Sequence, residues 1–294
     1  MRDLVLAALA SRYSVEVADT IAPGHARELA GAAAGDGVEL VATLGGDGTL
    51  NEAASALSGT GVPLYPLPGG SQNVFAKLLG LPSEIVDSTA RLLELADRWP
   101  LRRVDLGRAN DHVFTFAAGV GLDASVVDKV DANPERKARL KQWSYAQKGV
   151  SVFLRSYALR KPRILVESDG GEVAATTVLV QNGASFTFAG TRPVTLCANV
   201  ALDSGRFAAA LVKSGSPLRA AVTALRIVGA TAETDGVNGT TQLDRLTALR
   251  LRSADGQPLP LQVDGDFAGE HLAVDFATEP GALTVLAPSA THQA

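Results

Sequence analysis

The chain has little of several residue types whose abundance would mark a particular class of protein. Only one of its 294 residues is cysteine (Cys197), so no internal disulfide can form, which is typical of a reducing cytoplasm. Lysine and arginine number 27 against 31 aspartates and glutamates, whereas a nucleic-acid-binding protein normally has a basic excess. No apolar run approaches the roughly 18 residues of a membrane span. The sequence therefore predicts a soluble cytoplasmic protein without a nucleic-acid partner.

Composition also predicts a large folded core. Hydrophobic residues make up 46% of the chain and charged residues 20%, which argues against global disorder. A chain of 294 residues is long enough for two domains of ordinary size. Residues 1–4 lack the apolar segment of a secretory signal peptide, so we expect none.

The first hundred residues alternate between helical and strand patterns. Apolar residues at helical spacing predict helices, and short apolar or alternating runs predict strands. One of the helices has a candidate N-cap in Ser71 and a candidate C-terminal glycine in Gly80. The alternation favours a parallel sheet covered by helices on both faces. Helices are expected over residues 4–13, 25–34, 51–57, 72–79 and 85–99, and strands over 14–19, 38–44 and 61–67.

Beyond Pro100 the patterns become mainly those of strands. Asn110-Asp111 is a candidate hairpin turn between two of them. We therefore expect an α/β domain at residues 1–103, a larger β-rich antiparallel domain at 104–280, and a C-terminal segment at 281–294 that can return to the first domain. The strands are expected at 104–109, 112–118, 163–167, 172–181, 207–213, 246–252, 259–263, 272–276 and 282–287, and helices at 134–160 and 217–228.

The most informative stretch is Gly45-Gly46-Asp47-Gly48-Thr49-Leu50-Asn51-Glu52, which follows a predicted strand and enters a helix near Asn51. Glycines let the backbone approach a ligand without an intervening Cβ, and successive N–H groups at a helix start attract anions. A carboxylate at Asp47 fits this place if a divalent cation bridges it to phosphates or if it accepts a hydroxyl proton. The pattern predicts phosphoryl transfer from a nucleotide. The alternative is that the glycines only form a tight turn.

A second glycine turn, Pro68-Gly69-Gly70-Ser71-Gln72-Asn73, also joins a predicted strand to a helix. Ligands collect at this edge of open α/β sheets. Ser71 can cap its own helix, donate to a phosphate, or do both. Two such turns in one small domain favour a shared phosphate site. The first turn completes neither the G-x-G-x-x-G pattern nor the G-K-[ST] of a Walker loop.

Five motifs occur in the chain in this order: Gly45-Gly46-Asp47-Gly48-Thr49-Leu50-Asn51-Glu52, Pro66-Leu67-Pro68-Gly69-Gly70-Ser71-Gln72-Asn73-Val74-Phe75-Ala76, Val104-Asp105-Leu106-Gly107, Ala118-Gly119-Val120-Gly121-Leu122-Asp123-Ala124 and Val263-Asp264-Gly265-Asp266. Together they resemble the diacylglycerol kinase catalytic-domain family, which includes bacterial lipid kinases and the sphingosine and ceramide kinases. The first motif alone is shared with NAD kinases and phosphofructokinases, whereas the combination with the last motif is more specific. The resemblance spans nearly the whole chain.

The resemblance implies a Rossmann-like α/β domain that binds ATP, a β-rich antiparallel sandwich, and a lipid substrate that enters between them from a membrane surface. It implies that Asp264 is the general base for the lipid hydroxyl, and that Asp47 and Asp105 belong to an acidic network around Mg²⁺. Without the resemblance, Asp264 could equally lie in an ordinary surface turn. The implied ATP contacts are Thr20, Gly45, Gly46, Asp47, Gly48, Thr49, Asn51 and Ser71.

The chain departs from the family pattern in three places. The chain starts in what resembles the helix that follows the family's first strand, so this strand and its Asn-Pro-x-Ser-Gly-type loop are absent; either the start site is misassigned or the protein works without them. Val74 stands where many relatives have aspartate, and Ser204 stands where the structural metal loop has a carboxylate. The leading interpretation is an ATP-dependent lipid kinase, and an NAD kinase-like enzyme is the alternative enzyme. The departures also keep open a non-catalytic pseudokinase that binds a nucleotide or a lipid. The basic stretch 136–145 either faces a membrane or is a solvated helix surface.

Overall fold

The structure is a computed structural model that describes residues 1–121, 162–168, 171–213 and 240–288. It divides into two compact units, Met1–Leu106 with Pro280–Ala294, and Gly107–Glu279. The chain passes between the units within two long strands, β3 (Leu101–Ala109) and β16 (Ala273–Leu286). The helices predicted at 134–160 and 217–228, and with them the basic stretch, lie outside the described residues.

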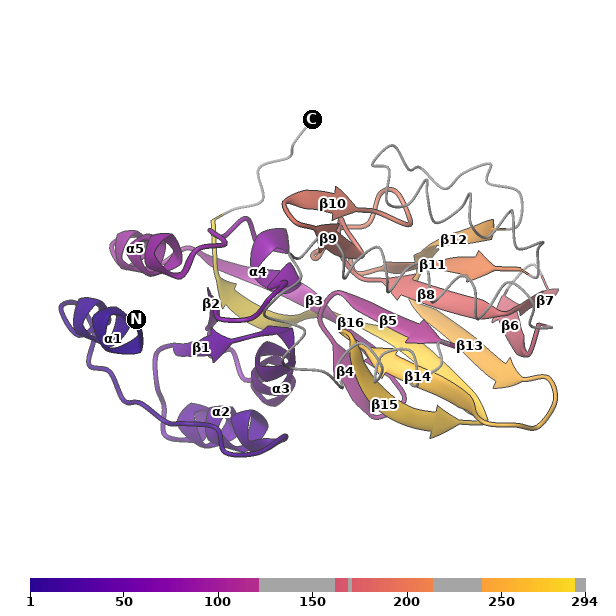
Figure 1. Ribbon diagram of the computed structural model, residues 1–294, viewed down its shortest axis with the longest axis horizontal. Helices are drawn as coiled ribbons and strands as arrows, with labels where there is room; N and C mark the ends of the chain where they lie inside the picture. Colours follow the sequence, from indigo (N-terminus) through magenta and orange to yellow (C-terminus); the bar gives the residue numbers. More distant parts are fainter. Residues whose placement is uncertain (122–161, 169–170, 214–239, 289–294) are drawn as a thin grey trace, which may run out of the picture. The chain divides into compact units, whose positions relative to one another are not determined.

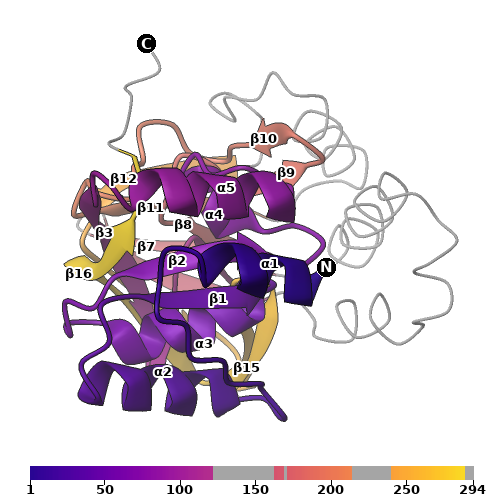
Figure 2. The same ribbon diagram turned by 90° about the vertical axis from the view of Figure 1, so that its left-hand side faces the viewer.

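In the first unit, parallel strands are covered by helices on two sides. Strand β1 pairs with β2, and β2 pairs with the end of β16, both in parallel. Helices α4 and α5 lie on one side of β1 and β2, and helices α2 and α3 lie on the other (Figures 1 and 2). The predicted α/β fold of this part is confirmed. The elements are α1 (Arg2–Leu9), α2 (His25–Gly35), β1 (Val41–Gly45), α3 (Asp47–Leu57), β2 (Leu64–Pro68), α4 (Val74–Leu78) and α5 (Ile85–Leu95).

Helix α3 shows why these residues form this layer. Its buried side chains, Leu50, Ala53, Ala54 and Leu57, follow the i, i+3, i+4, i+7 spacing of one helix face. The helix begins at Asp47, four residues before the predicted start, because its first turn is polar and carries no apolar periodicity. The first glycine turn therefore lies at the end of β1 and in the first turn of α3.

The strand predicted over residues 14–19 is wrong. These residues have no regular structure, and the Val15 and Val17 side chains are exposed. Alternating residues form a strand only when a neighbouring strand supplies hydrogen-bonding partners. Within the described residues, β1 pairs with β2 alone, so residues 14–19 have no such partner.

The second unit is built from antiparallel sheets, as the sequence predicts. One sheet has the order β12-β11-β8-β5-β14-β15, and the other strands include β16-β13-β6-β7 and the hairpin β3-β4. A small separate sheet pairs β9 with β10. The bounds are β4 (His112–Phe114), β5 (Ala117–Val120), β6 (Ile164–Ser168), β7 (Gly171–Ala175), β8 (Thr177–Gln181), β9 (Thr187–Ala189), β10 (Arg192–Val194), β11 (Phe207–Val212), β12 (Thr240–Leu246), β13 (Ala248–Ser253), β14 (Leu259–Val263) and β15 (Asp266–His271).

Residues from both sheets of this unit share one apolar core. The ring of Phe276 on β16 lies 6.1 Å from that of Phe114 and 6.5 Å from that of Phe207, measured between ring centroids. All three side chains are almost fully buried. Removing one such ring typically costs about 3–5 kcal/mol of stability. The shared core makes the second unit a sandwich of two sheets.

Candidate nucleotide-binding site

The two glycine turns lie against each other in the first unit. They follow paired strands, with Gly45 opposite Pro68 in the parallel ladder. The backbone N–H of Gly69 donates to the carbonyl oxygen of Gly45 at 2.9 Å. A Cβ added at Gly70 would stand only 2.5 Å from the Cα atom of Gly46. Glycine is therefore required here by backbone-to-backbone contact, at the carboxyl ends of both strands, where ligands collect in such sheets.

Asp47 ties the first turn to the second. Its Oδ2 accepts a hydrogen bond from the Val74 N–H at 3.1 Å, and its Oδ1 accepts one from the Phe75 N–H at 3.2 Å. Burial raises the pKa of Asp47, while these two N–H donors and the charge of Lys77 act in the opposite direction. The structure thus holds a partly desolvated carboxylate where the turns meet, which is a common feature of functional sites.

Ser71 does not cap helix α4, so that prediction is wrong. The helix starts at Val74, and its N-cap is Asn73, whose backbone is left-handed with φ 49°. The Asn73 side chain closes the second turn: its Oδ1 accepts from the Gly70 N–H at 3.0 Å and its Nδ2 donates to the Gly70 carbonyl at 2.9 Å. Asparagine tolerates this backbone region, so Asn73 is the sequence signal that could have predicted the turn. Ser71 itself is exposed.

The other predicted ATP contacts lie in two places. Gly48, Thr49 and Asn51 belong to α3, and the Thr49 side chain packs so closely on Gly45 that a Cβ there would stand 2.9 Å from it. Thr20 lies in the exposed irregular segment between α1 and α2. Strand order brings the residues of the two glycine turns together. The contacts of all these residues with ATP stay predictions.

Asp105 is buried in β3 at 2% exposure. Its Oδ1 accepts a hydrogen bond from the Gly281 N–H at 2.8 Å, and the Arg103 Nε donates to the Gly281 carbonyl at 2.9 Å. Gly281 has φ +57°, so these two side chains hold a bend in β16. Within the described residues, no three His, Cys, Asp or Glu side chains form a group that could hold a metal ion. The metal role of Asp105 stays a prediction.

Asp264 lies in the second unit and is 7% exposed. One carboxylate oxygen accepts from the Thr115 N–H at 2.7 Å and from the Thr115 hydroxyl at 2.8 Å. The other accepts from the N–H groups of Phe116 and Ala117, both at 3.0 Å. Asp264 and Gly265 have φ of 48° and 94° and form the two-residue turn between β14 and β15. Asp264 therefore secures a hairpin to the segment between β4 and β5.

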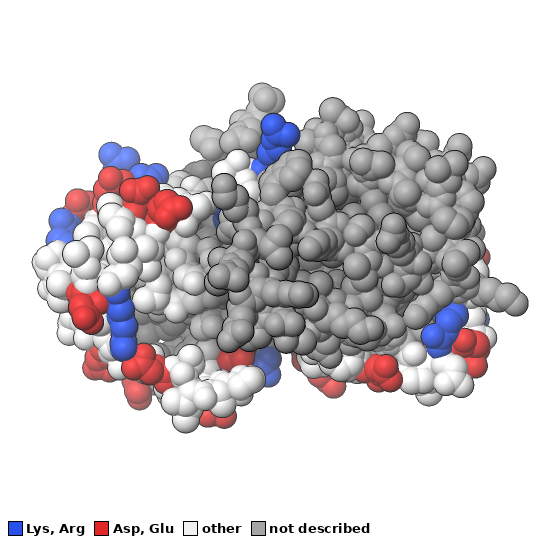
Figure 3. Space-filling model, viewed as in Figure 1, with Lys and Arg blue, Asp and Glu red and all other residues white. Residues whose placement is uncertain are grey.

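The described surface carries no single-sign patch in the view of Figure 3, where acidic and basic side chains are interspersed over the part that is not grey. In the described residues, no helix is both long and apolar enough to cross a membrane.

Comparison with known proteins supports the resemblance. Residues 3–127 match the diacylglycerol kinase catalytic domain. The diacylglycerol kinase of Mycobacterium tuberculosis is 28% identical over 271 residues, which cover 90% of this chain and 81% of that protein. A diacylglycerol kinase structure from Bacillus anthracis has a TM-score of 0.70 at 19% identity, over 97% of this chain and 91% of that one.

A second solved fold is also similar. An NAD kinase from Archaeoglobus fulgidus, solved in complex with ATP, has a TM-score of 0.52 at 11% identity, over 97% of this chain and 88% of that one. The predicted fold class is confirmed by both structures. The motif resemblance is confirmed as well: residues 3–127 match the model of the diacylglycerol kinase catalytic domain, and a relative that matches most of the chain is named a diacylglycerol kinase.

Proposed function

We propose that the protein is an ATP-dependent lipid kinase that transfers the γ-phosphate of ATP to the hydroxyl of diacylglycerol or a related lipid. The observation that carries this proposal is the contact between Gly46 and Gly70, with the carboxylate of Asp47 beside it. Similarity to the diacylglycerol kinase catalytic domain supports a lipid as the acceptor. A lipid acceptor also requires transient, peripheral contact with a membrane surface.

The glycine turns fit a phosphate group. Neither Gly46 nor Gly70 has a side chain, and the first N–H groups of any helix lack intrahelical acceptors. Helix α3 has eleven residues, and its N-cap, Gly46, supplies no capping side chain. An anion at this end is stabilised by the N–H groups and by the helix dipole. We place the ATP phosphates over the two turns.

Asp47 is the side chain that would hold Mg²⁺ there. Mg²⁺ is usually bound by one or two carboxylates together with substrate phosphates, so a cluster of three acidic groups is not required. When bound, the ion neutralises negative charge that develops on the transferred phosphoryl group. The Val74 and Phe75 N–H groups fix the orientation of the Asp47 carboxylate for this task.

Asp264 is proposed as the group that receives the proton of the lipid hydroxyl. In that step the hydroxyl oxygen forms a bond to the γ-phosphorus, the bond to the bridging oxygen of ADP breaks, and the proton leaves to the carboxylate. An aspartate is a weak base, so its use is to align the hydroxyl and accept the proton late. This role rests on the family resemblance.

The test is a transfer assay with labelled ATP, Mg²⁺ and mixed-lipid vesicles that contain diacylglycerol, a sphingoid base or phosphatidylglycerol. Each acceptor is assayed separately, and NAD is added as a soluble acceptor. Labelled lipid is the expected result. Labelled NADP would indicate an NAD kinase instead. Stabilisation by Mg-ATP in a thermal-shift titration, without transfer to any acceptor, would identify a pseudokinase.

A further inference from the structure

A carboxylate on α3, that of Glu52, caps the N-terminus of α2. The Glu52 Oε1 accepts a hydrogen bond from the Gly24 N–H at 2.8 Å, and its Oε2 accepts one from the Ala26 N–H at 3.0 Å. Gly24 is the N-cap of α2 and has a left-handed backbone with φ 88°. As a glycine it has no side chain with which to cap the helix. Glu52 supplies the acceptor that Ser or Asp supplies at an ordinary N-cap.

His25 also forms hydrogen bonds with the chain just before α2. The His25 Nδ1 accepts a hydrogen bond from the Ile21 N–H at 3.2 Å, and the His25 N–H donates to the Ala22 carbonyl at 3.2 Å. Residues 21–24 are exposed and outside regular structure, yet hydrogen bonds hold residues 21–26 at several points. Thr20 immediately precedes this fastened segment.

Glu52 lies on the same helix as the end of the first glycine turn and therefore links residues 20–26 to that turn. It is four residues after Gly48, so both lie on one face of α3, about 6 Å apart along the helix axis. Helices α2 and α3 pack closely, since a Cβ at Gly31 would stand 3.9 Å from that of Ala56. Four residues of chain join Gly24 to Thr20, a span of at most about 14 Å. The position of Thr20 relative to the turn therefore depends on where Glu52 anchors Gly24.

We propose that Glu52 is a positioning residue for nucleotide binding. Through Gly24 and Ala26 it holds the segment that carries Thr20 near the two glycine turns, so that the nucleotide meets a preformed surface. A preformed segment binds more tightly because its ordering entropy is not lost on binding. The inference rests on the proposed function, in which Thr20 contacts ATP.

The test compares Glu52→Gln with the wild type in direct binding of Mg-ATP by calorimetry. The glutamine keeps one acceptor oxygen but turns an NH₂ group toward the other N–H donor. We expect the Kd of Mg-ATP to rise about tenfold, which corresponds to about 1.4 kcal/mol. In the transfer assay KM for ATP should rise with kcat changed less than about twofold, as expected for lost uniform binding. Thr20→Ala should cost less in the Glu52→Gln background than in the wild type.

Glu28→Gln is the matched control. Glu28 is an exposed acid in the first turn of the same helix, so the substitution removes the same charge without touching Gly24 or Ala26. It should leave the Kd of Mg-ATP unchanged. Glu52→Asp keeps the charge with a shorter side chain and should give an intermediate Kd; it replaces the glutamine variant if that one does not fold.

Hydrogen exchange supplies a readout that is independent of catalysis. Residues 20–26 should exchange faster in Glu52→Gln, with α3 unchanged. If that segment is released and the Kd of Mg-ATP stays the same, the positioning role is overturned while the kinase proposal stands. If the wild type binds Mg-ATP but labels no lipid, the kinase proposal fails, and the binding comparison still decides the role of Glu52. A wild type that does not bind Mg-ATP overturns both.

Discussion

Gly46 and Gly70 touch through their backbones, with no room for a side chain on Gly70. The hypothetical Cβ of Gly70 would stand 2.5 Å from the Gly46 Cα and 3.1 Å from the Asn73 Oδ1. The Cα atom belongs to the backbone between β1 and α3, which cannot move without shifting both elements. The contact therefore sets the spacing between the turns that we assign to the ATP phosphates.

Gly70→Ala should destabilise the first unit and weaken ATP binding. Overpacking of this kind typically costs about 1–3 kcal/mol, and here the relief must come from separating the two glycine turns. Urea unfolding measures the stability loss, and Mg-ATP titration measures the affinity.

Gly35→Ala is the control for this substitution. Gly35 ends α2, has no positive φ, and has no heavy atom within 4 Å of an added Cβ. Alanine there should be neutral or stabilising by up to about 1 kcal/mol. If Gly70→Ala and Gly35→Ala had the same stability and the same affinity for Mg-ATP, the proposed role of the Gly46–Gly70 contact would be wrong.

Asp47→Asn should reduce activity and change how stability depends on pH. Burial raises the pKa of Asp47, so the native state holds this proton more tightly than the unfolded state. The stabilisation is fully present below the unfolded pKa near 3.8 and is lost as pH rises through the higher native pKa. The stability of the wild type relative to Asp47→Asn should therefore fall as pH rises above about 3.8, measured by urea unfolding at several pH values.

Turnover by Asp47→Asn should drop on the order of 100-fold if the Asp47 carboxylate takes part in charge stabilisation at the phosphates. Asp36→Asn, an exposed change at the end of α2, should retain wild-type turnover. Unchanged turnover in Asp47→Asn would remove this carboxylate from the proposed chemistry.

The sequence predicted the site where local rules are sufficient. Glycine turns after neighbouring parallel strands must meet at one sheet edge, and Gly46 and Gly70 do. Gly80 ends α4 as expected: with φ 73°, it donates to Lys77, while Leu81 donates to Ala76. The Asn110-Asp111 hairpin is present as well.

The features that the sequence did not predict depend on partners that are distant in sequence. Residues 14–19 alternate correctly but have no described strand beside them. The donors to Asp264 are nearly 150 positions earlier, and the donors to Glu52 are 26 and 28 positions earlier. Pro280-Gly281 interrupts the strand pattern, so the sequence predicted two strands where β16 is one, bent at a glycine held by Asp105. No local pattern specifies such pairs.

Asp264→Asn should destabilise the second unit. The amide NH₂ would face two of the donors now bonded to one oxygen, and buried donors left without acceptors cost about 1–3 kcal/mol each. We expect a loss of about 2–4 kcal/mol in urea unfolding. Asp266→Asn, on the exposed side of the same hairpin, should change stability little. A wild-type unfolding midpoint for Asp264→Asn would contradict the network.

The same variant tests the proposed base if turnover is measured well below its unfolding transition. ATP affinity should be nearly intact, because the substitution lies in the second unit, while turnover should be abolished. Retained turnover per folded molecule would leave Asp264 with the structural role alone.

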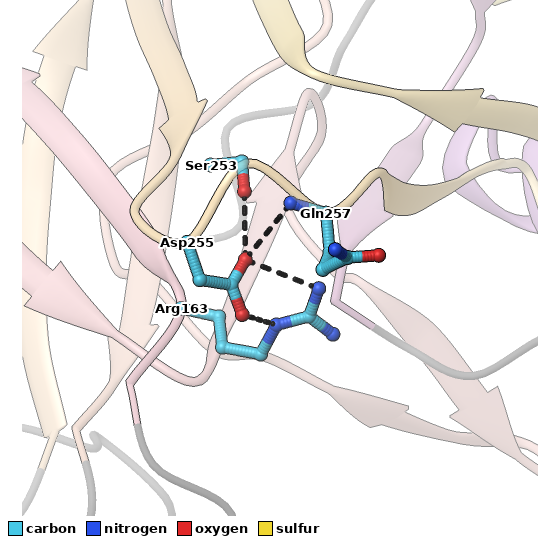
Figure 4. Close-up of polar contacts among 4 residues, drawn as sticks. All are labelled: Arg163, Ser253, Asp255 and Gln257. Atoms are coloured by element: carbon cyan, nitrogen blue, oxygen red, sulfur yellow. Dashed lines mark hydrogen bonds and ion pairs between the residues drawn. The ribbon is translucent and has the colours of Figure 1, made fainter.

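A last prediction concerns the exposed carboxylate of Asp255, which is held beside Arg163 in the second unit (Figure 4). The Arg163 Nε donates to one oxygen at 2.6 Å, and the Gln257 N–H and Ser253 hydroxyl donate to the other at 3.1 and 3.0 Å. The Arg163 hydrogen bond, followed by that from Gln257, lowers the pKa of Asp255 from 3.8 to about 2.

Because the native pKa is the lower one, the stabilisation is present above about pH 3.8 and is lost as pH falls through about 2. Arg163→Met should move the NMR titration of the Asp255 carboxyl toward 3.8. Its stability deficit should be visible near neutral pH, shrink with added salt, and vanish near pH 2. Arg250→Met, on an exposed arginine paired with Asp275 at 3.5 Å, should leave the Asp255 titration in place. An unchanged titration in Arg163→Met would show that the turn at Ser253 and Gln257, and not the arginine, sets this pKa.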